Sequence, residues 1–167
     1  MTAHSAVLIL DLLQRAEVPT WVAGGWGVDA LVGRESRPHA DLDLLISEQT
    51  SSRARQSLAA AGFVGALDEL PTRFEMTHQR LGVVDLHPIR FDANGNPRLE
   101  LPGGASWVYR SGALDAKGTI GARRCRCLSA QEQLRLHHGY EPREIDQADI
   151  RLLRSHLARG AEQHGGQ

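Results

Sequence analysis

The stretch A-G-G-W-G-V-D-A-L-V-G-R-E-S-R-P-H-A-D-L-D-L, residues 23–44, decides the fold. It begins at the end of a short β-branched and aromatic segment, residues 20–23, which predicts a buried strand. The glycine pair 24–25 breaks that strand, and residues 26–32 can form a short helix. Residues 41–46, D-L-D-L-L-I, predict a second strand that starts with two alternating acids. The stretch therefore predicts a strand, a glycine turn and a helix, followed by an acidic strand.

Further elements are expected on both sides of this stretch. Apolar residues at helical spacing predict a helix over 6–16, and the composition of 50–61 predicts another. Segments 73–78 and 81–89 have the composition of strands, and the short interval between them predicts an antiparallel hairpin.

The last part of the chain is expected to be helical. Ser129 and Glu132 have the spacing of a capping box, which predicts a helix to about His138. A final helix is expected over 145–158. The order of elements predicts an α+β fold, a small mixed sheet flanked by helices, with a core over residues 1–115 and a C-terminal strand and helical segment over 116–167 packed on it.

Composition bounds the class of protein. The chain has 167 residues, which suits one domain or one domain with a small appendage, and a formal net charge of −1. Proteins that grip nucleic acid usually have a clear basic excess, so no nucleic-acid partner is expected, although net charge alone does not exclude a local basic cleft. No secretory signal is visible, and no stretch approaches the roughly 20 apolar residues that span a bilayer. We expect a cytoplasmic protein with no membrane partner.

The densest basic cluster is R-R-C-R-C, residues 123–127. Its simplest interpretation is a solvated edge strand. Cys125 and Cys127 stand two apart, so in a strand both point to one face. This spacing is neither C-x-x-C nor a disulfide framework, and we expect buried thiols in a reducing compartment.

Three acids are the candidates for chemistry. Asp41 and Asp43 would share one face of a strand, about 7 Å apart at their α-carbons. Two like charges so placed repel unless a cation lies between them, and Mg²⁺ typically takes one or two carboxylates plus substrate phosphates. Asp85 lies inside an apolar strand, V-V-D-L-H, where a carboxylate is costly to bury unless it is paired or bound to metal. Placed beside the D-x-D strand, Asp85 would complete a three-carboxylate metal site.

The glycine turn offers a place for phosphate. Gly24 and Gly25 follow a strand and open a helix, so backbone N–H groups and a positive helix end can face an anion. Arg37 and His39 follow just before the acids, and an arginine suits phosphate through its fork of donors. Each feature alone is more often structural, as a turn or a surface loop.

Together these residues resemble a known signature. Residues 23–44 are similar to the signature of the polymerase-β-like nucleotidyltransferase superfamily, and more narrowly to the lincosamide nucleotidyltransferases and the aminoglycoside 2″-adenylyltransferases. F-E-M-T-H-Q-R-L-G-V-V-D-L-H-P-I, residues 74–89, resembles the strand pair of the lincosamide group, and residues 124–153 resemble its C-terminal part, with a Gly-Tyr between helices and a late Asp-Ile. Pro38 departs from the usual charged residue, which leaves the geometry of this loop open.

The resemblance implies a polymerase-β-like core and assigns roles. Its catalytic residues would be Asp41, Asp43 and Asp85, which would hold Mg²⁺, in the form of two ions, and ATP or another nucleoside triphosphate, with Asp85 as ligand, general base or both. The nucleotide-binding residues it implies are Gly24, Gly25, Trp26, Arg37 and His39. A substrate hydroxyl would attack the α-phosphorus and release pyrophosphate. The acceptor-binding residues it implies are Glu75, His87 and Tyr140.

Three functions stay open at this point. The first is transfer of a nucleoside monophosphate, AMP from ATP, to a hydroxyl of a small antibiotic. The L-H-P-I after Asp85 favours a lincosamide as acceptor, whereas an aminoglycoside would need an acidic cleft, which Asp68, Glu69 and Glu75 could supply. The second is an antitoxin-type enzyme acting on a macromolecule, and the third is a non-catalytic binding module. A homodimer is expected from the resemblance. Trp107 and Tyr109 could line an acceptor pocket or a dimer surface, or pack in the core.

Overall fold

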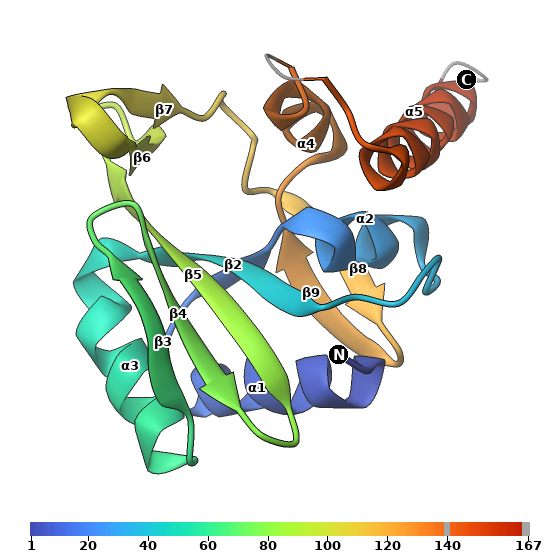
Figure 1. Cartoon of the computed structure of the whole chain (residues 1–167). Coiled ribbons are helices and arrows are strands. Elements are labelled where there is room, and N and C mark those ends of the chain that lie inside the picture. Colours follow the sequence, from blue (N-terminus) through green and yellow to red (C-terminus); the bar gives the residue numbers. More distant parts are fainter. Residues whose placement is uncertain (139–140, 165–167) are drawn as a thin grey trace.

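A nine-stranded sheet organises the computed structural model, which describes residues 1–138 and 141–164 (Figure 1). The strands are β1 (Thr20–Val22), β2 (Asp41–Ser47), β3 (Val64–Glu69), β4 (Arg73–His78), β5 (Gly82–Phe91), β6 (Pro97–Glu100), β7 (Ser106–Val108), β8 (Ala116–Ile120) and β9 (Arg123–Cys127). The α-helices are α1 (Ala3–Arg15), α2 (Gly24–Val32), α3 (Ser51–Ala60), α4 (Ala130–Leu136) and α5 (Glu144–His164), and short 3₁₀ turns lie at Glu48–Thr50 and Pro102–Gly104.

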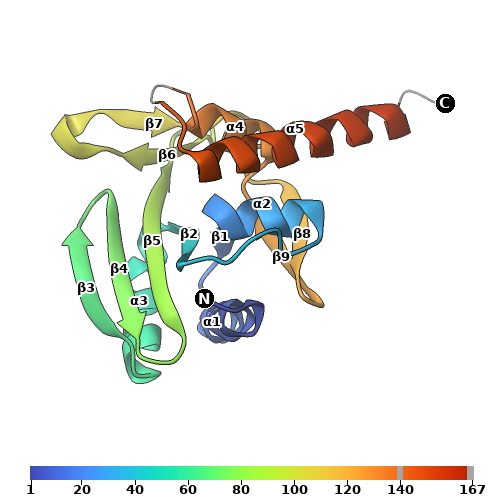
Figure 2. The ribbon, with the colours of Figure 1, turned by 45° about the vertical axis from the view of Figure 1, so that its right-hand side comes forward.

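The sheet is mixed, as the sequence predicts. The strand order is β3-β4-β5-β2-β1-β9-β8, and β6 and β7 extend from β5 as an antiparallel addition. β2 and β5 are parallel, as are β1 and β9, whereas the other pairs are antiparallel. Figures 1 and 2 show α1 and α3 on one side of the sheet, and α2 between the β8–β9 end of the sheet and the helices α4 and α5. β8 and β9 belong to the segment 116–167, yet they hydrogen-bond into the same sheet as β1.

Alternation along β2 sets the position of the acids. Leu42, Leu44 and Ile46 are fully buried and pack in the main hydrophobic core with residues of α1 and α3. Successive side chains of a strand point to opposite faces, so Asp41 and Asp43 face the other side of the sheet. The hydrophobic core thus fixes which face carries the charges.

The predicted elements around this centre are confirmed with small shifts. The 73–78 and 81–89 segments form the antiparallel pair β4 and β5. The Ser129 side chain accepts a hydrogen bond from the Glu132 N–H and caps α4. α5 is longer than expected, and Trp107 and Tyr109 pack in a second hydrophobic cluster with residues of β1 and β2.

Two features differ from the sequence prediction. β3 was not expected, because its side chains are mostly exposed and show no apolar alternation. The expectation that residues 123–127 form an edge strand is wrong, because β9 lies between β1 and β8. Cys125 and Cys127 are buried, as predicted, with their sulfurs 3.8 Å apart. Within the described ranges, no helix is long and apolar enough to cross a membrane.

A close approach between β8 and α2 yields a stability prediction. A β-carbon added at Gly118 would lie 2.3 Å from the carbonyl oxygen of Ala30, which is backbone and cannot swing away. Gly118→Ala should therefore lower the free energy of unfolding, measured in urea, by about 2–3 kcal/mol, the cost of overpacking. Gly65→Ala is the matched control, because no atom lies within 4 Å of an added β-carbon there. Equal stability of the two variants would contradict the packing described.

Candidate active site

Three acids lie in one row across three adjacent strands. Asp43 of β2 is in register with Asp85 of β5, which is in register with Glu75 of β4. Side chains in register on neighbouring strands lie on the same face, and Asp41, two residues before Asp43, shares that face. The structure therefore brings Asp41, Asp43 and Asp85 to one surface, as the sequence led us to expect.

His87 extends this row. Its Nε2 lies 3.4 Å from Asp85 Oδ2 and 3.9 Å from Asp43 Oδ1. Burial lowers the pKa of His87, but hydrogen bonds to Asp43 and Asp85 outweigh it and raise the pKa to about 9. The imidazolium is therefore the form present at neutral pH in the metal-free protein, and it offsets part of the charge of the two carboxylates.

Arg73 neutralises the other end of the row. Its Nη1 donates to Asp85 Oδ2 at 2.8 Å and to Glu75 Oε1 at 2.9 Å. Burial raises the pKa of the Asp85 carboxyl, but His87 and Arg73 outweigh this and hold it below its ordinary value. Asp41 makes no ion pair with the described residues, and burial together with the charges of Asp43 and Asp85 raises its pKa. Asp85 is thus held ionised, whereas Asp41 is the acid whose charge is least compensated.

The donor set fits a divalent cation. Donor atoms of Asp43, Asp85 and His87 lie within 4.8 Å of one another. Asp85 Oδ1 is buried and has no hydrogen-bond partner among the described residues, so it is a polar atom that needs a ligand. Carboxylate oxygens suit Mg²⁺, whereas an imidazole is the less usual ligand for that ion. The Asp41 carboxylate is not part of this cluster.

Gly24 and Gly25 lie directly against the acids and Arg37. A β-carbon added at Gly24, whose φ is +56°, would lie 1.9 Å from Asp43 Oδ2, and one added at Gly25 would lie 2.4 Å from Arg37 Nη2. The two glycines begin α2, so unpaired N–H groups of its first turn are next to the acids. Glycine at both positions lets the Asp43 carboxylate and the Arg37 guanidinium approach the backbone at the start of α2, which a larger residue would prevent.

A cavity of about 500 Å³ opens above this turn. One wall is Gly24, Gly25, the segment 37–41 and Asp43, and the other is the start of α5 with Asp146 and Asp149. This volume is within the range of small-molecule sites. The C-terminal helix thus forms one side of the candidate site.

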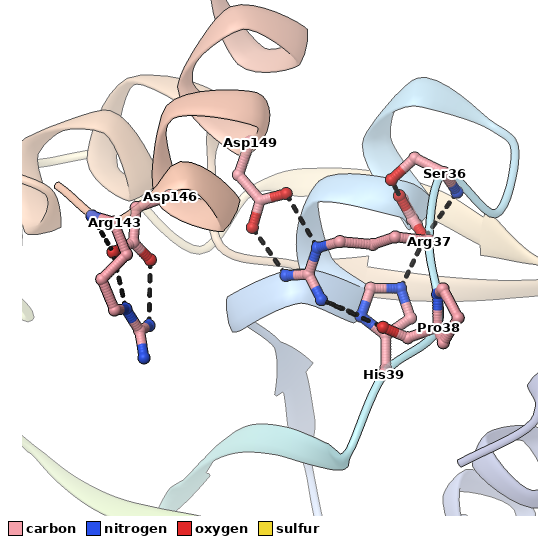
Figure 3. Close-up of polar contacts among 8 residues, drawn as sticks. Ser36, Arg37, Pro38, His39, Arg143, Asp146 and Asp149 are labelled. Carbon is pink, nitrogen blue, oxygen red and sulfur yellow. Dashed lines mark hydrogen bonds and ion pairs between the residues drawn. The ribbon is translucent and has the colours of Figure 1, made fainter.

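Arg37 connects the two walls, as Figure 3 shows. Its Nε and Nη2 donate to the Asp149 carboxylate at 3.2 and 2.7 Å, and its Nη1 lies 3.0 Å from His39 Nδ1. His39 Nε2 in turn lies 2.6 Å from Asp29 Oδ2, and the Ser36 N–H donates to the same oxygen. A chain of polar contacts therefore runs from α2 through the loop to α5.

Two of the residues that the resemblance assigned to the nucleotide are buried. Trp26 is 2% exposed and lies against the His39 ring, with the ring centres 4.4 Å apart. His39 is 4% exposed, although it contributes to the cavity wall, whereas Trp26 is absent from that wall. In this structure both side chains support the loop that presents Arg37.

Comparison with known proteins identifies the family. A family model described as aminoglycoside-2″-adenylyltransferase matches residues 6–153. The chain belongs to the aminoglycoside-2″-adenylyltransferase family. A lincosamide resistance protein from Staphylococcus haemolyticus is 32% identical over 155 residues, which are 93% of this chain and 96% of that protein.

Solved structures agree with this family assignment. A crystal structure of a lincosamide antibiotic adenylyltransferase with lincomycin bound is 32% identical, with a TM-score of 0.84 over 93% of this chain and 98% of that one. A crystal structure of ANT(2″)-Ia in complex with adenylyl-2″-tobramycin is 21% identical, with a TM-score of 0.72 over 96% of this chain and 94% of that one, and supports the fold. The polymerase-β-like nucleotidyltransferase resemblance is thus confirmed.

The acceptor residues implied by the resemblance are only partly placed in this adenylyltransferase-family member. Glu75 and His87 lie on adjacent strands on the face of the acid row. Tyr140 lies outside the described residues.

Several residues of the site were missed in the sequence. Arg73 bonds to the acid row, and its only signal was its position two residues before Glu75 on one strand face. Asp29 anchors His39 and was not singled out in the sequence. Asp149 is the acid of the late Asp-Ile, but nothing in the local sequence indicated that it pairs with Arg37.

The Arg37–Asp149 pair predicts a stability effect. Asp149 has a side chain only 6% exposed, so Arg37→Gln leaves a buried carboxylate unpaired. The free energy of unfolding should fall by about 3 kcal/mol, as for other broken buried pairs. The control is Arg53→Gln, which breaks an exposed pair with Glu17 and should cost less than about 1 kcal/mol. The double variant Arg37→Gln/Asp149→Asn should recover part of the lost free energy of unfolding. If the double variant is no more stable than Arg37→Gln alone, the pairing of Arg37 with Asp149 is contradicted.

His87 predicts a pH dependence of stability in the metal-free protein. Its folded pKa of about 9 exceeds the ordinary value of 6.5, so its contribution is fully present below about pH 6.5 and is lost as pH rises towards 9. In EDTA, the free energy of unfolding should therefore decrease over this window, by up to about 3 kcal/mol. His87→Gln should flatten the decrease, and replacement of the exposed His4 by Gln should leave it intact. A decrease of unchanged size in His87→Gln would assign the effect to other groups.

Proposed function

We propose that this chain transfers a nucleoside monophosphate, AMP from ATP, to a hydroxyl of a small antibiotic, with a lincosamide as acceptor. The carrying observation is the registered pair Asp43 and Asp85 next to the Gly24 turn, in a chain that is 32% identical to a lincomycin-bound adenylyltransferase over 93% of its length. In-line displacement at phosphorus mainly needs positioning and neutralisation of charge, and both can be provided at this surface.

Each residue has a role in this proposal. Asp43 and Asp85 would hold magnesium, with Asp41 as the further carboxylate for a second ion. Magnesium, when bound, would neutralise charge on the phosphates. The N–H groups that begin α2 at Gly24 and Gly25 would face the phosphates. Asp85 is ionised, so its carboxylate can accept the proton of the attacking hydroxyl.

Negative charge at this end of the sheet is only partly offset. Glu69 and Glu75 both pair with Arg73 at 2.9 Å, and Asp85 shares the same guanidinium. One arginine does not neutralise three carboxylates, so a polycationic aminoglycoside stays the second candidate acceptor. The preference for a lincosamide rests on the 32% identity to the lincomycin-bound adenylyltransferase, against 21% to the complex with adenylyl-2″-tobramycin.

The decisive assay is pyrophosphate release with each of four nucleoside triphosphates against lincomycin and a panel of aminoglycosides. We expect release with ATP and lincomycin, dependent on Mg²⁺ and abolished by EDTA. Asp43→Asn and Asp85→Asn should each lower the rate by at least about 1000-fold, because each removes a charge that stabilises the transferring phosphoryl group. Asp68→Asn is the matched control on an exposed strand and should retain the rate. Full activity of either site variant would refute the proposed centre.

Two further parts of this proposal concern assembly and location. We propose a homodimer, for which a monomeric mass by light scattering would be the contrary result.

ATP and magnesium are plentiful in the cytoplasm, which supports the cytoplasm as the place of reaction. Label from ATP appearing on a protein or nucleic acid in cell extract, with none on the antibiotic, would favour action on a macromolecule.

A further inference from the structure

A second cavity, of about 570 Å³, lies near the β8–β9 end of the sheet, opposite the β3 edge. Its wall includes Trp21, Phe91, Arg110, Lys117 and Arg126, and none of its residues belongs to the wall of the cavity above the acids. A smaller cavity of about 360 Å³ adjoins it and shares Lys117 and Arg126. This part of the surface has no role in the transfer reaction described above.

Positive charge is concentrated at this cavity, where the described wall has three cations and one acid. Lys117 and Arg126 are registered partners on β8 and β9, so two like charges stand directly opposite one another. Like charges in this position destabilise a sheet unless an opposite charge lies between them. The ion pairs of the described residues include none with Lys117, Arg126 or Arg110. Asp115 is the one acid in the cavity wall.

A neighbour on the same strand shows the contrast. Arg123, at the start of β9, donates to Asp11 at 2.6 Å and to Gln14 at 2.7 Å, both on α1. That cation is satisfied within the fold. Within residues 1–138 and 141–164, neither Lys117 nor Arg126 has such a partner, which indicates that their charge is available for a ligand.

Aromatic side chains adjoin these cations. The Arg126 guanidinium lies 4.6 Å from the centre of the Trp21 ring, in a cation–π contact. Arg126 is exposed, and we call its planar, cationic guanidinium the Arg126 platform. Phe91, whose ring centre is 6.4 Å from that of Trp21, is 48% exposed although it is a large apolar residue. Planar groups and cations together are the features that bind a base and its phosphate.

We propose that this cavity is a second ligand site, separate from the acid row, for a phosphate-bearing molecule with a planar ring. Arg110, Lys117 and Arg126 would bind the phosphate, and Phe91 with the Arg126 platform would contact the ring. The cavity volume is within the range of small-molecule sites. A planar ring and a phosphate are present both in a free nucleotide and in a single-stranded nucleic acid. The competition experiment below is designed to distinguish these two ligands.

Lys117 makes a site-specific test possible, because it is the only lysine in the sequence. Pyridoxal 5′-phosphate carries a phosphate, a planar ring and an aldehyde, which condenses with the lysine amine and releases water. Borohydride then reduces the imine to a stable amine, and mass spectrometry measures the label on the peptide with Lys117. Pyridoxal, which lacks the phosphate, is the comparison probe. Because pyridoxal closes to an internal hemiacetal and reacts more slowly with any amine, the yield of each probe is divided by its yield on free Nα-acetyl-lysine. We expect at least about tenfold more label from the phosphorylated probe, the ratio worth one charge-assisted hydrogen bond.

Competition identifies the source of the ligand. The intact chain is labelled in EDTA with ATP, inorganic pyrophosphate or a single-stranded oligonucleotide present. If ATP protects Lys117 from labelling at a lower concentration than pyrophosphate does, the ligand is a free nucleotide. If only the oligonucleotide protects Lys117, the ligand is a single-stranded nucleic acid. Arg126→Gln should reduce the preference for the phosphorylated probe to less than about half, because one of three cations is lost. Arg151→Gln removes an exposed arginine of α5 and should leave it unchanged.

Two results would overturn the proposal. One is equal labelling of Lys117 by pyridoxal and its phosphate, which would show that the cavity has no affinity for phosphate. The other is a phosphate preference that none of the three competitors reduces at millimolar concentration, or that Arg126→Gln leaves intact. Circular dichroism of Arg126→Gln establishes that a changed preference comes from the lost charge and not from loss of fold.

Discussion

The register between β2 and β5 is the constraint on which the rest of the site depends. It places Asp43 directly beside Asp85 on parallel strands, an arrangement that is unfavourable for two carboxylates. The hydrophobic core fixes this register, because a shift by one residue would turn Leu42 and Leu44 from the core to the charged face. Burial on one face of β2 therefore holds together the repelling charges on the other.

The repulsion is offset from one side only. Arg73 and His87 contact Asp85, and His87 also reaches towards Asp43. On the other side, Asp43 packs directly against the backbone of Gly24, where a β-carbon would meet its carboxylate. Asp43 and Asp41 belong to the wall of the cavity, so this is the side from which a cation with a triphosphate would enter.

The centre of this site could be predicted from the sequence, and the reasons are local. Period-two alternation places Asp41 and Asp43 on one face, and an acid within the apolar run around Asp85 needs a partner, so convergence follows once the strands are neighbours. The supporting contacts could not be predicted in this way. Arg37 meets Asp149 across a sequence separation of 112 residues, and His39 meets Asp29 because α2 folds back over the loop. β9 was expected at an edge because it contains the densest basic cluster of the sequence, but β8 covers its outer side.

The pKa values of Asp41 and Asp85 are shifted in opposite directions. Asp85, next to Arg73 and His87, has a lowered pKa, whereas the pKa of Asp41 is raised by burial, by Asp43 and by Asp85. As pH falls, Asp41 is therefore protonated before Asp85. A cation bound beside the cavity would lower the pKa of Asp41, because it would stabilise that carboxylate. Arg73 and His87 thus keep Asp85 ionised to accept a proton, whereas the charge of Asp41 depends more on what is bound.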